Sequence, residues 1–358
     1  MATETTVDAD LLAGPDAAVR GSGGYFVRVA EVIEETPDAR SFVVETVAPG
    51  GPPYRPGQFL TVRVPDSGRG AARCYSLSSS PHTDTAMKFT VKRVEGGHGS
   101  NWLCDCVSAG DELEVLPPAG TFTPGSLDEA VVLVAGGSGI TPVIAIAKSI
   151  LFGGDGDVVL IYANRDQESV IFARELRALE DRFADRLTVI HVLESVQGYP
   201  TRRMLSILLR PFIDRSVFIC GPAPLMDLAA DVCASVGFPQ AQVHTERFLS
   251  LRRDPFAVTA EAGDAAGELV CAVEVSLDGA DHRVPWTSGQ KLLDALLAAG
   301  LDAPYSCREG ACSACVCSLT SGRVELAHNE ILSSDDIADG YILACQAVPV
   351  SDEISIEY

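Results

Sequence analysis

The chain has 358 residues, of which 47% are hydrophobic, and a formal net charge of −22 at pH 7. This length predicts two or three globular domains, and the negative charge disfavours nucleic acid and anionic lipid as partners. No run of about 18 uncharged apolar residues occurs, so we expect no membrane-spanning helix. Residues 1–10 lack an export signal, and the eleven cysteines then predict a reducing cytoplasm, with thiols kept for metal or redox work.

The first third of the chain predicts a β-barrel. Residues 1–24 are acidic and lack apolar periodicity, so we expect a disordered leader there. In the range 25–125, short apolar segments alternate with Pro and Gly turns, which is typical of a closed antiparallel barrel. The expected strands cover residues 25–34, 39–46, 58–64, 72–78, 87–94 and 112–116.

One expected strand of this barrel carries candidate flavin-binding residues. Arg73, Tyr75 and Ser76 offer a cation for a pyrophosphate, a planar ring for the isoalloxazine and a hydroxyl near its N5 atom. Strand alternation places Arg73 and Tyr75 on one face and Ser76 on the other. The alternative is a tyrosine that is merely packed.

A glycine-rich segment further along supports the flavin interpretation. Gly97 and Gly99 precede a short helical pattern, and Ser100 is expected to be the N-cap of that helix. The free N–H groups at such a helix start would receive a flavin phosphate. The alternative is a simple turn cap.

After residue 124 the pattern changes to buried strands that alternate with amphipathic helices. This alternation predicts a parallel α/β sheet with right-handed crossovers over residues 126–248. The expected strands are 130–135, 158–162, 187–193, 217–220 and 242–248, with helices over 142–152, 168–183 and 225–236.

A glycine turn joins the first strand of this domain to its first helix. Gly137 and Gly139 let the backbone approach a pyrophosphate or nicotinamide ring, with Thr141 expected at the N-cap and Pro142 at the first helical position. The strict G-x-G-x-x-G spacing is missing, and a glycine turn can also serve packing alone.

A second close backbone approach is predicted at the end of the fourth strand. Cys220, Gly221 and Pro222 stand at the carboxyl edge of the sheet, where open α/β sheets bind ligands. A cysteine at a strand end can also be a small buried packing residue. With Ser76, Cys220 is our candidate for a catalytic residue beside the reacting rings.

The segment after the second strand bears on coenzyme choice. Arg165 is followed by two acids, Asp166 and Glu168, which disfavour the extra phosphate of NADPH and predict NADH. Arg202 and Arg203 leave NADPH open, because they could fold toward the site.

A linker is expected over residues 249–270, and an acidic last domain over residues 271–358. Its cysteine spacing, C-x4-C-x2-C followed by one distant cysteine, is that of plant-type ferredoxins, which hold a [2Fe–2S] cluster. The predicted ligands are Cys307, Cys312, Cys315 and Cys345. A zinc site or a reduced thiol cluster is the alternative, but zinc sites favour paired cysteines at both ends. The acidic surface serves either solubility or steering toward a basic partner.

Together these motifs resemble the ferredoxin-NADP reductase superfamily. The order flavin, nicotinamide, ferredoxin is similar to its oxygenase-reductase branch. Residues 74–83, 100–105 and 297–304 resemble in particular the reductase components of 3-ketosteroid 9α-hydroxylases. The resemblance implies a β-barrel flavin domain, an α/β nicotinamide domain and an α+β (β-grasp) ferredoxin domain.

The resemblance also implies which cofactor and residues form the flavin site. FAD is implied rather than FMN, with Arg73 and Ser100 at its pyrophosphate, Tyr75 beside the ring and Ser76 near N5. Phe248 would cover the ring, although a phenylalanine at the end of a strand can equally belong to the core. Glycine is common in relatives at the position of Ser313, so the serine is a departure from the pattern.

The implied function is that of an NADH-dependent oxidoreductase. Electrons would pass from NADH to FAD, to the [2Fe–2S] cluster and then to a Rieske-type oxygenase, here a 3-ketosteroid 9α-hydroxylase in steroid degradation. One alternative is a reductase for another oxygenase with an aromatic or acyl-thioester substrate. A second is a non-catalytic iron-sulfur carrier or sensor.

Overall fold

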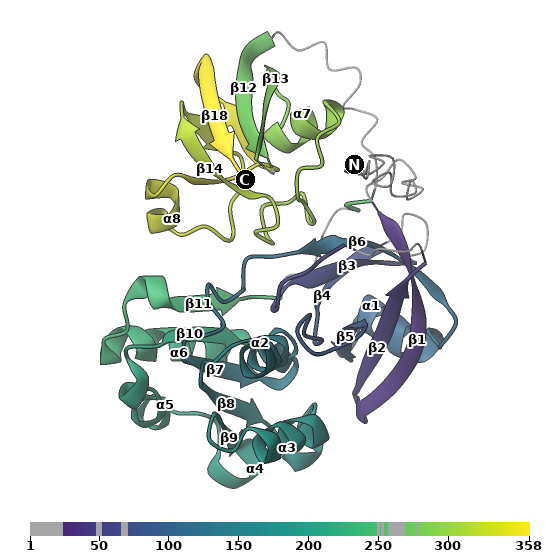
Figure 1. Ribbon diagram of the computed structural model, residues 1–358, viewed down its shortest axis with the longest axis vertical. Helices are drawn as coiled ribbons and strands as arrows, with labels where there is room; N and C mark the ends of the chain where they lie inside the picture. Colours follow the sequence, from purple (N-terminus) through teal and green to yellow (C-terminus); the bar gives the residue numbers. More distant parts are fainter. Residues whose placement is uncertain are drawn as a thin grey trace, which may run out of the picture.

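The computed structural model describes residues 24–47, 52–65, 71–248, 251, 254–256, 269–277 and 279–358. The expected leader, apart from its last residue, and most of the expected linker lie outside the described residues. The described residues form three bodies, each built on its own sheet (Figure 1). Within these ranges, no helix is long and apolar enough to cross a membrane.

The first body is an antiparallel sheet that closes on itself. In the described part of the chain it has six strands in the order β4-β3-β6-β1-β2-β5. A bridge between Leu77 and Phe89 joins the end of β4 to β5, so the two edges of the sheet meet. The expected barrel is therefore confirmed, with β1 (Tyr25–Thr36), β2 (Ala39–Thr46), β3 (Phe59–Val64), β4 (Ala71–Ser76), β5 (Met87–Lys92), α1 (His98–Cys106) and β6 (Glu112–Ala119).

The second body is the expected parallel sheet. Over residues 131–246, all of them described, its strand order is β11-β10-β7-β8-β9. Alternate residues of β7 enter two cores: Leu133 packs with α2 and α3, whereas Val132 packs with α5 and α6. Helices thus cover both faces of β7 (Val131–Gly136), β8 (Val158–Asn164), β9 (Leu187–Leu193), β10 (Ser216–Cys220) and β11 (Val243–Glu246), with α2 (Ile140–Gly153) and α3 (Ala173–Arg182) on one side and α5 (Arg202–Leu209) and α6 (Ala223–Val236) on the other.

Two helical segments differ from the expectation. The helix expected over 168–183 is split, because Phe172 adopts a left-handed φ of 62° and α3 begins only at Ala173. Ile171 and Phe172 are buried in the core, so packing outweighs helical continuity there. The unpredicted α5 follows α4 (Glu194–Gln197) and begins after Thr201, whose hydroxyl accepts the N–H of Met204.

The third body is the expected α+β domain. Its described residues build a mixed sheet in the order β13-β12-β18-β14-β16, in which β12 and β18 are parallel and the other pairs antiparallel. Trp286 is fully buried beside α7 in its core. The elements are β12 (Leu269–Leu277), β13 (Ala280–Thr287), α7 (Leu292–Ala298), β14 (Val316–Ser321), β15 (Val324–Leu326), α8 (Ser334–Ala338), β16 (Tyr341–Leu343), β17 (Ala347–Pro349) and β18 (Glu353–Glu357).

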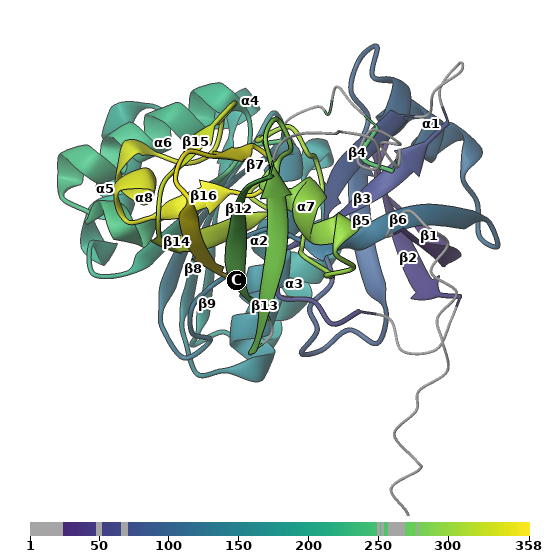
Figure 2. The ribbon, with the colours of Figure 1, turned by 90° about the horizontal axis from the view of Figure 1, so that it is seen from above.

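The three bodies are packed against one another. The third body lies over the barrel and the parallel sheet (Figures 1 and 2). Its segment 306–315, which holds three of the predicted cluster ligands and is called the cluster loop below, packs against β3, β4 and β6 of the barrel. The fold thereby places the predicted cluster beside the predicted flavin strand.

Candidate functional site

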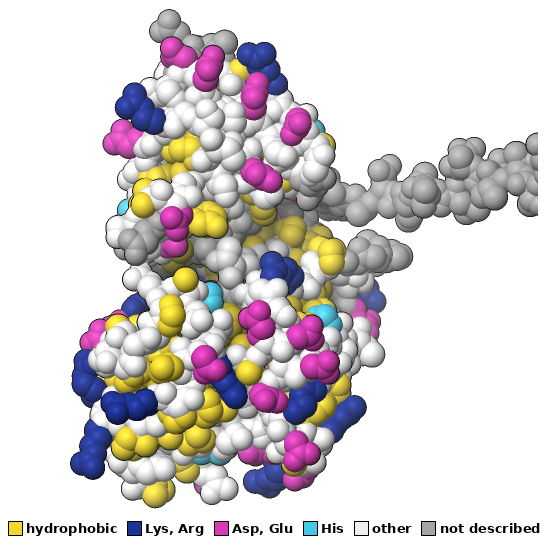
Figure 3. Space-filling model, turned by 60° about the vertical axis from the view of Figure 1, so that its left-hand side comes forward, with side chains coloured by type: hydrophobic (Ala, Val, Ile, Leu, Met, Phe, Trp, Pro, Cys, Tyr) yellow, Lys and Arg dark blue, Asp and Glu magenta, His cyan; other side chains and the backbone are white. Residues whose placement is uncertain are grey.

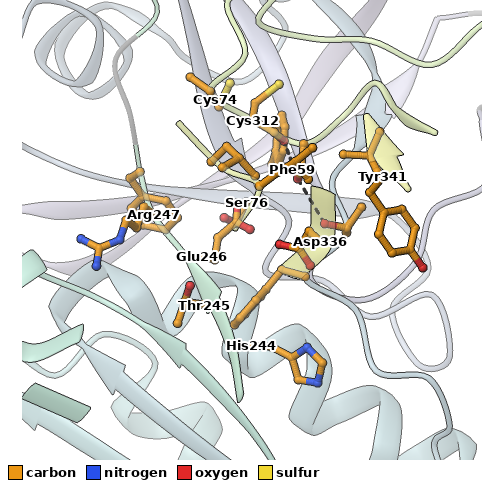
Figure 4. Close-up of a pocket in the computed structure, with 18 of the residues that line it drawn as sticks. Phe59, Cys74, Ser76, His244, Thr245, Glu246, Arg247, Cys312, Asp336 and Tyr341 are labelled. Atoms are coloured by element: carbon orange, nitrogen blue, oxygen red, sulfur yellow. Dashed lines mark hydrogen bonds between the residues drawn. The ribbon is translucent and has the colours of Figure 1, made fainter. Parts of the chain in front are cut away.

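A cavity of 510 Å³ lies where the three bodies meet. Figure 3 shows a hollow between the third body, at the top of that view, and the rest of the molecule. Its volume falls in the range of small-molecule sites, about 300–1,000 Å³. In Figure 4, Cys74, Ser76, Cys312 and Glu246 lie together, whereas Arg247 extends away from them. These residues come from the barrel, the parallel sheet and the cluster loop, so one cavity connects all three bodies.

The predicted flavin strand, β4, divides its side chains as expected. Cys74 and Ser76 line the cavity, and Arg73 and Tyr75 lie on the opposite face, against Gly99 of α1. A Cβ atom on Gly99 would come within 2.8 Å of the Arg73 Cγ atom and 3.4 Å of the Tyr75 hydroxyl. Glycine at this position therefore keeps open the cradle in which a flavin phosphate would meet the arginine and the helix start.

The start of α1 differs in detail from the expectation that Ser100 is its N-cap. The helix begins at His98 with Gly97 as N-cap, and among the described residues no side chain caps it. Ser100 is the third helical residue; its buried hydroxyl accepts the N–H of Val94 at 3.1 Å. The serine thus fixes the preceding turn, and the uncapped helix start suits a phosphate.

The two glycine segments of the parallel sheet are brought together. A Cβ atom on Gly139 would lie 2.2 Å from the Cys220 carbonyl oxygen and 2.6 Å from the Gly221 nitrogen, so only glycine allows this contact. Gly137 has a φ of 52°, and its carbonyl accepts the hydroxyl of buried Tyr162 at 3.0 Å. The turn is therefore held open at the carboxyl edge of the sheet.

The positions expected for Thr141 and Pro142 are both wrong by two residues. Helix α2 begins at Ile140 with Gly139 as N-cap, so Thr141 and Pro142 are its second and third residues. Proline is tolerated there because the N–H groups of the first turn have no partner within the helix. The Thr141 hydroxyl donates to the Ser138 carbonyl at 3.0 Å, which closes the turn.

Two smaller cavities open beside this turn. One, of 420 Å³, is lined by Gly137, Gly221, Pro222 and Phe248, and the other, of 210 Å³, extends past the end of β8. Both are lined by Lys92 of the barrel. An ammonium group at this place is suited to the pyrophosphate of a dinucleotide. Sequence reasoning missed Lys92 because it belongs to a different domain from the glycine turn.

Glu246 and Cys220 are neighbours on adjacent strands of the parallel sheet. The register pairs Cys220 of β10 with Glu246 of β11, and Glu246 lines the main cavity. Burial raises the pKa of Glu246 to about 8. Burial also raises the pKa of the Cys220 thiol well above its ordinary value. Both groups are therefore neutral near pH 7. Phe248 is 48% exposed at the junction of two cavities, rather than in a core.

The predicted cluster ligands lie together around the cluster loop. Cys307, Cys315 and Cys345 are buried, and Cys312 is partly buried and reaches the main cavity. Backbone N–H groups donate to three of the sulfurs, as in sites where such bonds tune a cluster. These bonds run from Glu309 and Ala311 to Cys307 Sγ at 3.3 and 3.4 Å, from Cys307 to Cys312 Sγ at 3.3 Å, and from Cys345 to Cys315 Sγ at 3.4 Å.

The chemistry of this donor set suits thiolate ligation. Hydrogen bonds from the Cys312 and Cys345 thiols, with those from the backbone, lower the pKa of Cys307, and the same contacts raise the pKa of the Cys312 and Cys345 thiols, so the sulfurs interact directly with one another. Another buried cysteine, Cys317, contacts Tyr358, and burial raises its pKa. Within the described residues, no group of three or more His, Cys, Asp or Glu surrounds the place of a single ion. A [2Fe–2S] cluster shares its four cysteines between two irons.

Family models match all three bodies. Residues 27–123 match an oxidoreductase FAD-binding domain, residues 133–231 an oxidoreductase NAD-binding domain, and residues 275–350 a 2Fe-2S iron-sulfur cluster binding domain. The predicted cofactor classes are thereby confirmed, and the class of protein is an NAD(P)H-dependent flavin and iron-sulfur oxidoreductase.

Individual relatives match this chain over nearly their whole length. The ferredoxin reductase component of a 3-ketosteroid-9-alpha-monooxygenase from Rhodococcus rhodochrous is 52% identical over 94% of this chain and 98% of its own. One component of the 1,2-phenylacetyl-CoA epoxidase from Escherichia coli (strain K12) is 30% identical, with coverage of 93% and 97%. A solved phthalate dioxygenase reductase is 28% identical with a TM-score of 0.56, covering 94% of this chain and 98% of that one. The chain belongs to the family of three-domain ferredoxin reductase components.

Proposed function

We propose that this chain is the reductase component of a 3-ketosteroid 9α-monooxygenase and delivers electrons from NADH to a Rieske-type oxygenase. The observation that carries the proposal is the shared cavity, where the flavin strand, the end of the nicotinamide sheet and a predicted cluster ligand meet. The 52% identity to a steroid monooxygenase reductase supports the particular oxygenase. A reducing cytoplasm suits its eleven thiols.

The residues that would hold the cofactors follow from the geometry above. When bound, FAD would convert a two-electron hydride into single electrons, which the [2Fe–2S] cluster would carry onward. On the flavin side, Arg73 and the start of α1 would bind phosphate, and Ser76 would donate a hydrogen bond from the cavity wall. The four cysteine thiolates would bind the cluster. The wider binding set we propose is Tyr75, Gly97, Gly99, Ser100, Gly137, Gly139, Thr141, Pro142, Cys220, Gly221, Pro222 and Phe248.

Three arrangements of charge support NADH over NADPH. Arg165, at the small cavity, pairs with Asp38 of the barrel at 3.1 Å, and Arg202 pairs with Asp231 at 3.0 Å. Glu194 adds a carboxylate to the same small cavity. A 2′-phosphate in the small cavity would meet Arg165 and Lys92, which share Asp38 as an acidic partner, together with the carboxylate of Glu194. We expect a higher kcat/KM for NADH, and a higher value for NADPH would refute this preference.

A second candidate function is service to another oxygenase, because relatives at 30% and 28% identity carry the names of an acyl-thioester epoxidase and an aromatic dioxygenase. The test measures NADH-driven reduction of three oxygenase components, one for each substrate class, by the purified holoprotein. The proposal requires the steroid oxygenase to have the highest kcat/KM. Equal or better reduction of another oxygenase would reassign the partner. A protein with no NADH turnover toward any acceptor would instead fit a carrier or sensor.

A further inference from the structure

The flavin strand β4 and the cluster loop both contact strand β3 of the barrel. Strands β3 and β4 are paired so that Phe59 faces Ser76 and Thr61 faces Cys74. Cys74 and Ser76 line the main cavity, whereas Thr61 contacts Ser306 at the beginning of the cluster loop. A shift of the loop on these strands would therefore change its position relative to the flavin site.

Two hydroxyl pairs connect the loop to the barrel, one beside each of two predicted ligands. The Thr61 and Ser306 hydroxyls lie 2.5 Å apart, directly before Cys307. Thr121 follows β6, and its hydroxyl donates to the hydroxyl of Ser313 at 3.2 Å. Ser313 stands directly after Cys312 in the chain. The pairs thus hold both ends of the segment between these ligands.

Apart from a weak contact between Ser306 and Cys74 Sγ at 3.8 Å, the other contacts that join the loop to the barrel within the described residues are apolar. Cys307 and Ala311 pack with Ala72 and Leu116, and Ala314 packs with Phe59 and Ala119. Apolar burial favours association but is not directional, so it does not by itself fix the position of the loop. Hydrogen bonds have preferred distances and angles, and the two hydroxyl pairs can supply the missing constraint.

Ser313 adopts a backbone conformation that favours glycine. Its φ is 55°, a left-handed value that glycine reaches without steric cost. A glycine there would relieve the backbone but would remove the hydroxyl that accepts from Thr121. This serine also donates to the Cys312 carbonyl at 2.7 Å, so a single side chain connects a ligand's backbone to the barrel.

We propose that the Thr61–Ser306 and Thr121–Ser313 pairs are positioning contacts that hold the cluster loop against the flavin strands and thereby set the rate of flavin-to-cluster electron transfer. The step moves one electron: the flavin is oxidised by one electron, the cluster is reduced by one, and no covalent bond forms or breaks. The inference rests on the proposed cysteine ligands and is independent of the identity of the oxygenase.

The burial of the hydroxyls predicts an order of effects. Thr61 and Ser306 are each 1% exposed, so Thr61→Val leaves the serine hydroxyl buried with only a distant sulfur, Cys74 Sγ at 3.8 Å. The free-energy cost of this poorly paired hydroxyl applies only while the third body is docked on the barrel, because water reaches the hydroxyl when the two bodies separate. Ser313 keeps its bond to the Cys312 carbonyl, so Thr121→Val should have a smaller effect.

The experiment compares holoprotein variants with two readouts. Deuterium uptake of peptides that cover β3 and the cluster loop reports docking, and single-turnover reduction of the cluster after rapid flavin reduction by NADH reports the electron-transfer rate. For Thr61→Val we expect faster uptake at both peptides and a rate about 5- to 30-fold lower. Thr121→Val should lower the rate less, and the combined variant most. Thr61→Ser should restore both readouts. Thr287→Val, which removes a hydroxyl bonded only within the third body, is the matched control and should change neither.

Three results would overturn the inference. Unchanged uptake and rate in the combined variant would show that apolar packing alone positions the loop. A changed electron paramagnetic resonance signal or reduction potential of the cluster in Thr61→Val would show that the threonine acts on the cluster itself. Failure of Thr61→Ser to restore the rate would assign the effect to packing rather than to the hydroxyl. NADH-dependent flavin reduction is followed in the same samples, so loss of the reductase function would be recognised separately.

Discussion

Replacement of Lys148 should loosen the contact between the flavin barrel and the nicotinamide sheet. This lysine lies on α2 of the parallel sheet and is 2% exposed. Its ammonium nitrogen lies 2.7 Å from Asp84 of the barrel and 2.8 Å from Glu175 of α3, and it donates to the Ser78 carbonyl at 3.3 Å. Lys148→Met keeps most of the side-chain length but leaves the two carboxylates without this cation.

The expected magnitude follows from the burial of the partners. Breaking a buried ion pair by removing one partner costs about 3–5 kcal/mol. Asp84 and Glu175 are 31% and 29% exposed, and Glu175 keeps its ion pair with Lys88 at 3.1 Å, so the low end of this range, about 3 kcal/mol, is the appropriate figure. For a unit of about 150–250 residues this corresponds to a fall of about 6–12 °C in the unfolding midpoint.

The assay is thermal release of flavin from the holoprotein, followed by fluorescence. Arg28→Met is the matched control, because its ion pair with Glu112 is exposed at 57% and 46% and should contribute less than about 1 kcal/mol. Lys148→Met combined with Glu175→Gln should recover part of the loss. An unchanged midpoint in Lys148→Met, or a shift equal to that of Arg28→Met, would refute the argument.

Acid should weaken the same contact. Burial alone would raise the pKa of Glu175, but Lys148 and Lys88 outweigh it and lower the pKa below its ordinary value of 4.5. Stability linked to a lowered pKa is present above the ordinary value and is lost as the pH falls through the lowered one. In Lys148→Met this loss should begin at higher pH, which flavin release at a series of pH values would measure.

Three further predictions concern the electron path. Cys307→Ser should abolish reduction of the oxygenase but leave NADH-dependent flavin reduction largely intact in stopped-flow absorbance, and equal loss of both would contradict the division of labour between the domains. Lys92→Met should raise the KM for NADH about 10-fold with a smaller change in kcat, because the charge-assisted hydrogen bond that we propose between its ammonium group and a coenzyme phosphate would be lost; an unchanged KM would exclude this role. Glu246 ionises near pH 8, so flavin reduction should slow above that pH as a negative charge appears in the cavity, and Glu246→Gln should remove this decline. A decline that persists in the variant would assign it to another group.

Local sequence patterns predicted the elements that carry the cofactor chemistry. The cysteine spacing indicated which thiols lie together, and strand alternation placed Arg73 and Ser76 on opposite faces of β4, because both depend only on covalent geometry and backbone period. The predicted helix starts were less accurate. Ser100 stabilises the turn before α1 from a position inside the helix. Serine is also a common N-cap residue, so the residue type does not distinguish the two roles.

The contacts between domains could not be predicted in this way. Lys92 of the barrel lines the two smaller cavities beside the glycine turn. Lys148 is buried against Asp84, and Thr61 contacts Ser306, which lies 245 positions later in the chain. Each pair joins residues far apart in sequence, and no period or spacing relates them. Only the relative placement of the folded domains brings them together.

The most direct test of the proposed function is reconstitution of the holoprotein with a 3-ketosteroid 9α-hydroxylase oxygenase, NADH and 4-androstene-3,17-dione. The account predicts that 9α-hydroxylated steroid forms in step with the NADH consumed, and that Cys307→Ser forms none. Rapid NADH-dependent reduction of an artificial acceptor without any hydroxylated steroid would contradict the assignment to a steroid monooxygenase.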